Sequence, residues 1–586
     1  MTSDSKNFRL STYPVPHHYF SLYFNDLLYR QSFQNLILAS TKDSNATAII
    51  DRQLPYIMIN SRRTFLRQIG LGTAGLVLAP SLNGWAQAAP IPHNLPRSTP
   101  EMQGVAAEVL HQLFDAMDAS DIEFHSVMVM RNGFVIGEGW WAPYAPQYKH
   151  TLHSLSKSFT SAAVGLAINE GHFTVESPVI SFFPELAPKD VSANLAAMKV
   201  KHLLTMTTGH AADNGLRTDA KPWVQSFLAA PIVHEPGTFY VYNTTATYML
   251  SAIVQKTTGQ KVFDFLTPRL LKPLNIEGAD WEVSPQGINT GGFGLRVRTE
   301  DIASFSQLYL NKGNWKGKQL IPAAWVEAST KSQWEFNANP FGGNKTKAED
   351  DWQQGYGYQF WRTQHNGFRS DGLYGQFGIV LPDENLVVAI TEQSFNTQQS
   401  LNFVWDLLVP GLQKNALPTS PGSDQQLKTR LNRLEVKSAK AVAVPGVATA
   451  ISGKTFKLDN NSLGATAATF NFDAKGCALV VAHDTGLRTL NFKYSNWEKS
   501  KNGRLLNSQL PFPVGGLPDV SSEVACKATW LDENTLHLAI RPVETVTSDS
   551  ITCHFGENTV TLTFLHSVAL AGKAKEARPV LTGHIS

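Results

Sequence analysis

The sequence predicts an α+β unit over residues 98–412 and a small all-β unit over 446–586, joined by a linker over 413–445. A chain of 586 residues is longer than one hydrophobic core usually supports. Helical and alternating apolar patterns are mixed before residue 412. Beyond residue 450, short alternating segments are separated by turn residues roughly every 8–12 positions, which is typical of a small β-barrel or sandwich.

The α+β prediction rests on the order of its elements. Apolar residues at helical spacing over 102–119 predict a first helix. HSVMVM and FVIGEGWW flank Arg131-Asn132-Gly133, which predicts a hairpin. A nearly all-apolar helix is expected after Ser154, ended by Gly171.

A long region that is rich in helices and loops follows, over about 172–355. Strand patterns return at QFGIVL and LVVAIT, separated by Pro382-Asp383-Glu384-Asn385, and a helix around 398–409 closes the unit. This order predicts an antiparallel sheet flanked by helices, with an inserted helical lobe.

Composition excludes several classes of function. The chain has 42% hydrophobic and 17% charged residues and a formal net charge of +2, without a dense basic run, so a nucleic-acid partner is not expected. It contains no apolar run of about 18 residues, so no membrane span is expected. The three cysteines, Cys477, Cys526 and Cys553, lack zinc-site spacing, and whether any two form a disulfide cannot be read from the sequence.

An export signal is predicted sixty residues into the chain. From Met58, the segment 58–88 has basic Arg62 and Arg63, a moderate apolar run, and the small-residue site Ala86-Gln87-Ala88. SRRTFLR resembles the twin-arginine signal of bacterial export. The alternative is a short internal helix with basic residues. On the export interpretation, residues 1–57 reflect a misassigned start site, and the mature protein begins near Ala89, periplasmic or secreted.

The sequence Ser154-Leu155-Ser156-Lys157 raises the question of catalysis. At a helix start, Ser154 and Lys157 lie one turn apart on one face, and a neutral lysine amine can take a serine proton. Alternatively, a serine caps the helix and the lysine faces water. The same pattern recurs at Ser3-Asp4-Ser5-Lys6, so the four residues alone decide nothing.

Longer segments favour the catalytic interpretation. HSLSKSFTSAAVGLAINEG, VKHLLTMTTGH, PGTFYVYNTT and SDGLYGQFGIVLP occur in the order found in S-x-x-K serine enzymes. Over residues 98–412 the chain resembles the serine β-lactamase / penicillin-binding-protein superfamily, and more closely its class C-like esterase and 6-aminohexanoate-dimer hydrolase branch. The resemblance implies a β-lactamase/transpeptidase-like fold for this unit.

The resemblance also implies roles for individual residues. Ser154 matches the acylated nucleophile, Lys157 its proton acceptor, and Tyr242 the tyrosine that passes a proton to the leaving group. Leu373-Tyr374-Gly375 occupies the place of the K-T-G strand, where Tyr374 and Gly375 would contact substrate. The backbone N–H groups of Ser154 and Gln376 would form the oxyanion hole. No metal or organic cofactor is implied.

Two departures from the family pattern qualify these roles. Thr244 stands where the family has the Asn of Y-x-N, and strict matches occur only at Tyr23, Tyr309 and Tyr494, in unsuitable positions. Leu373 replaces the K-T-G lysine that would bind a substrate carboxylate. Arg369 could substitute, although a solvated strand-end arginine is the simpler expectation.

Taken together, the sequence predicts an exported serine hydrolase that acts through an acyl-enzyme on an uncharged ester or amide. The alternatives are a weak β-lactamase or D-alanyl peptidase, and a non-catalytic binder of cell-wall fragments. The missing lysine at Leu373 argues against the first alternative, because an unpaired substrate carboxylate in a cleft is costly. The expected partner is a small molecule, and the oligomeric state stays open.

Overall fold

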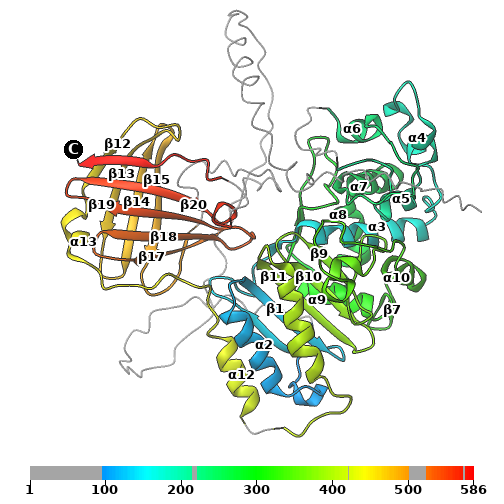
Figure 1. The fold of residues 1–586 in the computed structure, drawn as a ribbon, viewed down its shortest axis with the longest axis horizontal. Coiled ribbons are helices and arrows are strands. Elements are labelled where there is room, and N and C mark those ends of the chain that lie inside the picture. The colour runs from blue at the N-terminus through cyan, green and yellow to red at the C-terminus, as the bar shows by residue number, and fades with distance from the viewer. Residues whose placement is uncertain (1–94, 214–220, 420–421, 501–522, 572–574, 586) are drawn as a thin grey trace, which may run out of the picture. The chain divides into compact units, whose positions relative to one another are not determined.

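The computed structural model describes residues 95–213, 221–419, 422–500, 523–571 and 575–585 (Figure 1). All of them belong to one of two compact units, Pro92–Ser586. The twin-arginine segment and the residues before it lie outside the described residues. Within the described ranges, no helix is both long and apolar enough to cross a bilayer.

A six-stranded antiparallel sheet forms the centre of the first part, and confirms the predicted α+β class (Figure 1). The strand order is β2-β1-β11-β10-β9-β8. The strands are β1 (Glu123–Arg131), β2 (Phe134–Trp140), β8 (Trp361–Arg362), β9 (Phe368–Gly372), β10 (Gln376–Leu381) and β11 (Leu386–Gln393).

Both predicted hairpins are present in this sheet. The β1–β2 turn places Asn132 and Gly133 at φ angles of 52° and 83°, the left-handed conformation that a tight two-residue hairpin requires and that Asn-Gly adopts readily. The β10–β11 hairpin pairs Leu381 with Leu386 across the predicted turn. Both hairpins were therefore predicted correctly, because each joins two neighbouring segments of the chain through a turn with a recognisable sequence.

Two hydrophobic cores cover the two faces of the sheet. On one face, α2 (Ala107–Ala119) packs against α12 (Ser423–Leu431) and the π-helical turn η9 (Val404–Leu408), α12 contacts β2, and their apolar side chains share one core with those of the sheet (Figure 1). On the other face lie α9 (Thr299–Leu310), α3 (Ser156–Asn169) and the helical lobe. The strand β1 is buried along almost its whole length because helices cover it on both sides.

The helical lobe follows α3, as the sequence predicted. Its contacts centre on α3 and α7, which pack against each other. The lobe and the segments after it contain α4 (Ala193–Ala197), α5 (Val200–Leu204), α6 (Trp223–Ala229), α7 (Thr244–Thr258), α8 (Val262–Leu266), η6 (Thr267–Leu271) and α10 (Ala323–Thr330).

The closing helix of this part is present as predicted, whereas the linker differs from the sequence-based expectation. The helix predicted around 398–409 is α11 (Thr397–Phe403) continued by the π-helical turn η9. The segment expected to be a linker contains helix α12, which buries Leu427 and Leu431 against the first part. Two apolar side chains in a polar stretch are too weak a periodic signal to predict a helix that exists because of a partner surface.

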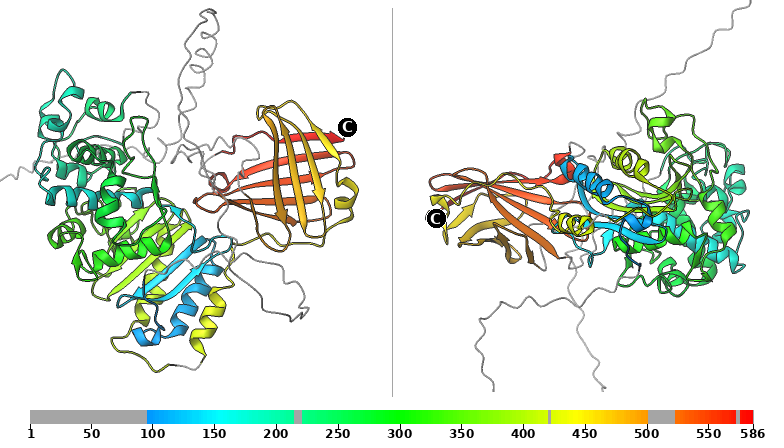
Figure 2. Two further views of the ribbon diagram at one scale, coloured as in Figure 1. Left: turned by 180° about the vertical axis from the view of Figure 1, so that it is seen from behind. Right: turned by 90° about the horizontal axis from the view of Figure 1, so that it is seen from below.

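The C-terminal part is a β-barrel. Ten strands follow the order β15-β14-β13-β12-β21-β20-β19-β18-β17-β16, and an additional β15–β17 pairing closes the sheet. Figure 2 shows the earlier strands (yellow-orange) and the later strands (orange to red) as two crossing layers. The strands are β12 (Thr455–Leu458), β13 (Ala465–Phe472), β14 (Gly476–His483), β15 (Gly486–Lys493), β16 (Glu498–Ser500), β17 (Val524–Trp530), β18 (Thr535–Pro542), β19 (Asp549–Phe555), β20 (Thr559–His566) and β21 (Leu581–Ile585).

Side chains fill the barrel interior. Phe456, Phe470, Trp530 and Phe555 form one aromatic cluster with ring centroids 5.1–6.2 Å apart for the pairs in contact. Cys477, Cys526 and Cys553 are buried as free thiols, so none of the three forms a disulfide. The barrel core therefore depends on apolar packing.

Candidate active site

Ser154 lies in a short 3-10 turn, η2 (His153–Leu155), directly before helix α3. His153, the residue before it, has a φ angle of 47°, which is uncommon for a residue with a side chain. Such local strain is frequent at functional sites. Ser154 is half-buried, whereas every residue from Leu155 to Ala167 is buried. The serine is therefore the point at which this buried segment meets solvent.

The Lys157 amine is held at the serine. Lys157 is 1% exposed, and its Nζ lies 3.0 Å from Ser154 Oγ. The same Nζ donates to the backbone oxygen of Gly292 at 2.8 Å and lies 3.5 Å from Thr244 Oγ1. The alternative of a lysine that points to water is wrong, because these contacts keep the amine inside the protein.

Tyr242 lies beside the same amine. Lys157 Nζ is 4.9 Å from the centroid of the Tyr242 ring. The competing Tyr309 is buried in α9 among Phe305 and Phe360. Tyr494 follows β15 in the barrel sequence. Tyr242 is thus the tyrosine that the structure brings to the S-x-x-K pair.

Asn243 and Thr244, the two residues after Tyr242, make different contacts. Asn243 caps helix α7 by accepting a hydrogen bond from Ala246 N at 3.1 Å. Thr244 is the residue that reaches Lys157, and its backbone N–H donates to Asp213 at 3.0 Å. The departure from Y-x-N therefore leaves an oxygen next to the lysine.

The end of β9 approaches the serine loop at Gly372. A side chain at Gly372 would overlap the backbone oxygen of Leu152 and crowd Leu155 N, so only glycine allows this approach. The following N–H, that of Leu373, donates to no acceptor in the part of the chain that the structure describes. It is a second candidate, beside Gln376, for an oxyanion donor.

The segment Leu373-Tyr374-Gly375 is a turn and not the strand expected from the K-T-G comparison. Tyr374 and Gly375 have φ angles of 68° and 91°, which are incompatible with an extended strand. Gly375 N donates to Gly372 O at 3.1 Å and closes the turn. Gln376 opens β10 opposite Gly372. We call residues 372–376 the oxyanion turn.

The side chains of this turn point in different directions. Tyr374 is 5% exposed and packs edge-on against His153 and Phe395, with ring centroids 5.5 and 5.0 Å apart. Leu373 is 45% exposed. Gln376 is buried, and its Nε2 donates to Glu392 O at 2.7 Å. The contacts of Tyr374 and Gly375 with substrate stay a prediction.

Arg369 is fully buried, so the expectation of a solvated strand-end arginine is wrong. Its Nε donates to Asp371 at 2.9 Å, and its Nη1 to the backbone oxygens of Arg362 and Asp351 at 2.8 and 3.1 Å. The guanidinium also lies 4.7 Å from the ring centroid of Trp352. Because these contacts fix the cation, Arg369 does not replace the K-T-G lysine.

Asp371 is the acidic group closest in chain to this turn. Burial raises the pKa of Asp371 to about 6, and Arg369 and Lys157 partly oppose that shift. The carboxyl therefore gains its charge near neutral pH. It does so within electrostatic reach of Lys157.

Aromatic side chains form a wall around Tyr242. The Tyr242 ring stacks on Trp361 and meets Phe341 edge-on, both with centroids 5.7 Å apart. Phe341 is 39% exposed, so this wall reaches solvent. An apolar or aromatic substrate group would find favourable contact there.

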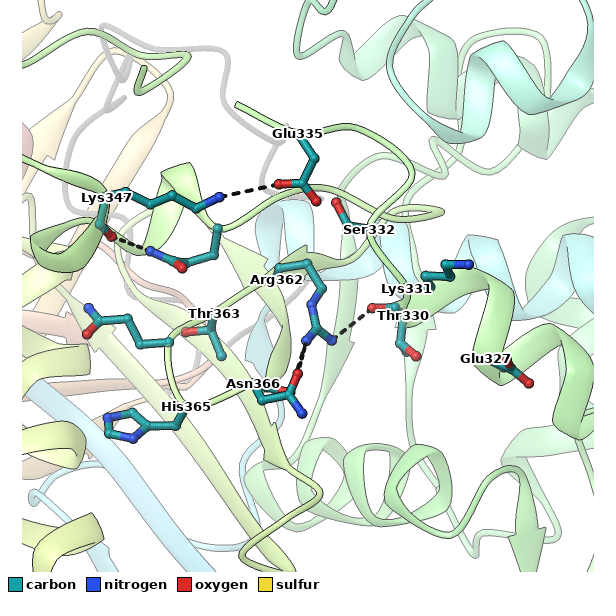
Figure 3. A pocket seen from close by; sticks show the side chains of 12 residues that line it. Glu327, Thr330, Lys331, Ser332, Glu335, Lys347, Arg362, Thr363, His365 and Asn366 are labelled. Carbon is teal, nitrogen blue, oxygen red and sulfur yellow. Dashed lines mark hydrogen bonds and ion pairs between the residues drawn. The ribbon is translucent and has the colours of Figure 1, made fainter. Parts of the chain in front are cut away.

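A cavity of about 810 Å³ lies around Arg362 (Figure 3). Among its lining residues, Arg362 donates to Thr330 O and to Asn366 Oδ1, and Lys347 pairs with Glu335. Across the described ranges, no group of three or more His, Cys, Asp and Glu side chains is arranged to hold a metal ion.

Sequence reasoning missed two contributors to this site, Gly292 and Asp371, and singled out Thr244 only as a departure from the family pattern. The Gly291-Gly292 pair was a usable signal, because paired glycines often allow close backbone approach. A side chain at Gly292 would crowd Thr244 and Lys157. Nothing in the sequence marked Asp371, since a single acid on a strand carries no pattern.

Comparison with known proteins identifies the family. The sequence matches the family described as Beta-lactamase over residues 110–409, just over half of the chain. The chain belongs to the β-lactamase family, and its first part has the fold of the serine β-lactamase / penicillin-binding-protein superfamily, which confirms the predicted resemblance.

Two curated relatives show that sequence identity within the family is low. The 6-aminohexanoate-dimer hydrolase of Paenarthrobacter ureafaciens is 25% identical over 217 residues, covering 34% of this chain and 55% of the relative. The beta-lactamase of Escherichia coli (strain K12) is 24% identical over 192 residues, covering 28% and 48%. The chain thus spans about half the length of the curated relatives it matches.

Solved structures are similar at low identity. EstCE1, a hydrolase with promiscuous acyltransferase activity, is 16% identical with a TM-score of 0.42, covering 51% of this chain and 96% of EstCE1. The octameric penicillin-binding protein homologue from Pyrococcus abyssi is 14% identical with a TM-score of 0.41, covering 81% and 99%. At these identities the likeness concerns the fold alone.

The Arg369–Asp371 pair predicts a pH-dependent stability defect. Arg369→Met removes the cation that lowers the Asp371 pKa, so that pKa rises beyond about 6. An acid whose pKa is higher in the folded than in the unfolded state loses stability as pH rises through the folded value. We expect the variant to lose about 3–5 kcal/mol at pH 8, the usual result of breaking a buried ion pair, and less at pH 5.

Urea unfolding of the wild type and the variant at both pH values checks this. The double variant Arg369→Met/Asp371→Asn is the control, because it has no carboxyl at this position, and the stability of Arg369→Met relative to this control should fall between pH 5 and pH 8. A defect of Arg369→Met that is equal at pH 5 and pH 8 would contradict the assignment.

Proposed function

We propose that this protein is a serine hydrolase that forms a covalent acyl-enzyme at Ser154. The observation that carries the proposal is the 3.0 Å separation of Ser154 Oγ from a lysine amine that is buried and held by Gly292 and Thr244. A serine hydroxyl beside a positioned base is the arrangement that activates it as a nucleophile.

The acylation step follows from these positions. Lys157, as the neutral amine, takes the Ser154 hydroxyl proton while Oγ attacks the substrate carbonyl carbon. The resulting oxyanion is bound by Ser154 N–H and by an N–H of the oxyanion turn, either Leu373 or Gln376. Collapse expels the alcohol or amine, which receives a proton through Tyr242 and Lys157. Water then hydrolyses the acyl ester by the same groups in reverse.

The surroundings of the serine favour an uncharged ester or amide. Arg369 is committed to Asp371, and the K-T-G lysine is absent. Leu373 and Phe395 are 45% and 40% exposed, and Phe341 adds a third accessible apolar surface beside Tyr242. The similarity to a 6-aminohexanoate-dimer hydrolase and to EstCE1 supports amides and esters as the first substrates to test.

A fluorophosphonate probe tests for the activated nucleophile. The wild type is expected to gain the mass of one adduct, and Ser154→Ala to gain none, because the oxygen of an activated serine displaces fluoride from the probe and becomes phosphonylated. Lys157→Ala should slow labelling by roughly 10²-fold or more through loss of the base. Intact-protein mass spectrometry is the measurement, and Ser156→Ala is the matched control. Unlabelled, folded wild type would favour a non-catalytic binding role.

A pair of chromogenic substrates tests the substrate class. We expect hydrolysis of a p-nitrophenyl ester with kcat/KM at least about tenfold above that for nitrocefin, because an unpaired carboxylate in the cleft costs several kcal/mol. Introducing a cation with Leu373→Lys should narrow that ratio. Faster turnover of nitrocefin by the wild type would move the assignment to a β-lactamase.

Export by the twin-arginine route is the second part of the proposal. It is supported by the order of Arg62-Arg63, apolar run and Ala86-Gln87-Ala88, which lie outside the described residues. Expression in bacteria with and without the twin-arginine translocase checks it. We expect a periplasmic form that begins near Ala89 only in the strain that has the translocase. The variant Arg62→Lys/Arg63→Lys should stay in the cytoplasm of that strain. Full-length cytosolic protein in both strains would contradict export.

A further inference from the structure

A buried carboxyl on strand β11 is in contact with the oxyanion turn. Glu392, on β11, is fully buried. In the β10–β11 register, Phe377 pairs with Ile390, and continuing by two residues places Gly375 opposite Glu392. A side chain at Gly375 would overlap Glu392 Oε1, so the carboxyl is in contact with the glycine backbone of the turn. No other acid faces the turn from this strand.

The environment of Glu392 favours the neutral form of its carboxyl. Burial raises its pKa well above the ordinary value, and the nearby Asp371 carboxyl raises it further, while a hydrogen bond from Ser400 opposes this. Ser400 Oγ donates to Oε1 at 2.6 Å, whereas Oε2 is buried with no hydrogen-bond partner among the described residues. A neutral acid with an unsatisfied buried oxygen is uncommon and calls for an explanation other than stability.

Glu392 and its neighbours hold the turn at several points. Its backbone oxygen accepts from Gln376 Nε2 at 2.7 Å, and Ser394, two residues on, donates from its backbone N to Tyr374 O at 3.0 Å. The turn needs such support, because Tyr374 has a φ angle of 68°, which a tyrosine does not favour.

We propose that Glu392 is a positioning residue that fixes the oxyanion turn from below, so that its backbone N–H groups stay directed at the acyl oxygen on Ser154. The inference rests on the proposed hydrolase function. Ser400 fixes the carboxyl, the carboxyl abuts Gly375, and Gly375 in turn sets the direction of the N–H groups between Gly372 and β10. Because oxyanion donors act through position, a shift of a fraction of an ångström in this turn lowers the rate of the chemical step.

Four variants of the whole chain test the role. Glu392→Gln keeps the shape and the neutral state, and should retain kcat for a p-nitrophenyl ester within about threefold. Glu392→Ala empties the space under Gly375, and should lower kcat at least about tenfold with KM changed less than about threefold, as expected when oxyanion donors are misplaced. Ser400→Ala, which removes only the hydroxyl, should fall between them.

Val388→Ala is the matched control. It lies four residues away on the same face of β11 and opens a cavity in the core, so it should lower stability while leaving kcat within about threefold of the wild type. If Glu392→Ala does not fold, Ser400→Ala carries the comparison. Full kcat in Glu392→Ala, equal loss in Glu392→Gln, or equal loss in Val388→Ala would each overturn the positioning role.

Fluorophosphonate labelling separates this inference from the function on which it rests. One adduct on wild type and Glu392→Ala, formed more slowly on the variant, supports both. An adduct formed at the same rate on each sinks only the role of Glu392. A wild type that forms no adduct sinks the hydrolase and the positioning role together.

Discussion

A lysine amine that is withdrawn from water must find its hydrogen-bond acceptors inside the protein, and this requirement organises the candidate active site. Lys157 finds them on three segments: Ser154 on its own helix turn, Thr244 at the start of α7, and Gly292 in the loop before β5 (Leu295–Val297). The last two lie 87 and 135 residues away in the chain. The helical lobe and the sheet must therefore pack correctly before the amine is satisfied, and an unsatisfied buried amine would be costly.

Backbone proximity is the second constraint on this centre. Gly292 lies against Lys157, Gly372 against the serine loop, and Gly375 against Glu392, and at each position a side chain would overlap a neighbour. The oxyanion turn is therefore enclosed from both sides, by the serine loop and by β11. This enclosure gives backbone N–H groups a fixed direction without any charged side chain, which suits stabilisation of a developing oxyanion.

The charged side chains beside the oxyanion turn, Arg369 and Asp371, form an ion pair that is largely buried. Arg369 is held by Asp371, by two backbone oxygens and by the face of Trp352. The family uses a strand-edge lysine to bind a carboxylate, whereas this chain places Leu373 in the turn and keeps its nearby arginine buried. Under the proposed function, this difference in charge is what favours an uncharged substrate.

The sequence by itself determined the features whose signals are local: the two hairpins with Asn132-Gly133 and Pro382–Asn385, the buried helix after Ser154, the short strands of the barrel, and the S-x-x-K pair with its tyrosine. Turn chemistry and apolar periodicity act between neighbours in the chain, so they can be read there. Only the tertiary structure decided that Thr244 and Gly292 hold the lysine, that 373–375 is a turn, that Arg369 is buried, and that Glu392 lies beneath Gly375. Each of these depends on contacts between segments far apart in the chain, which single residues without a pattern do not reveal.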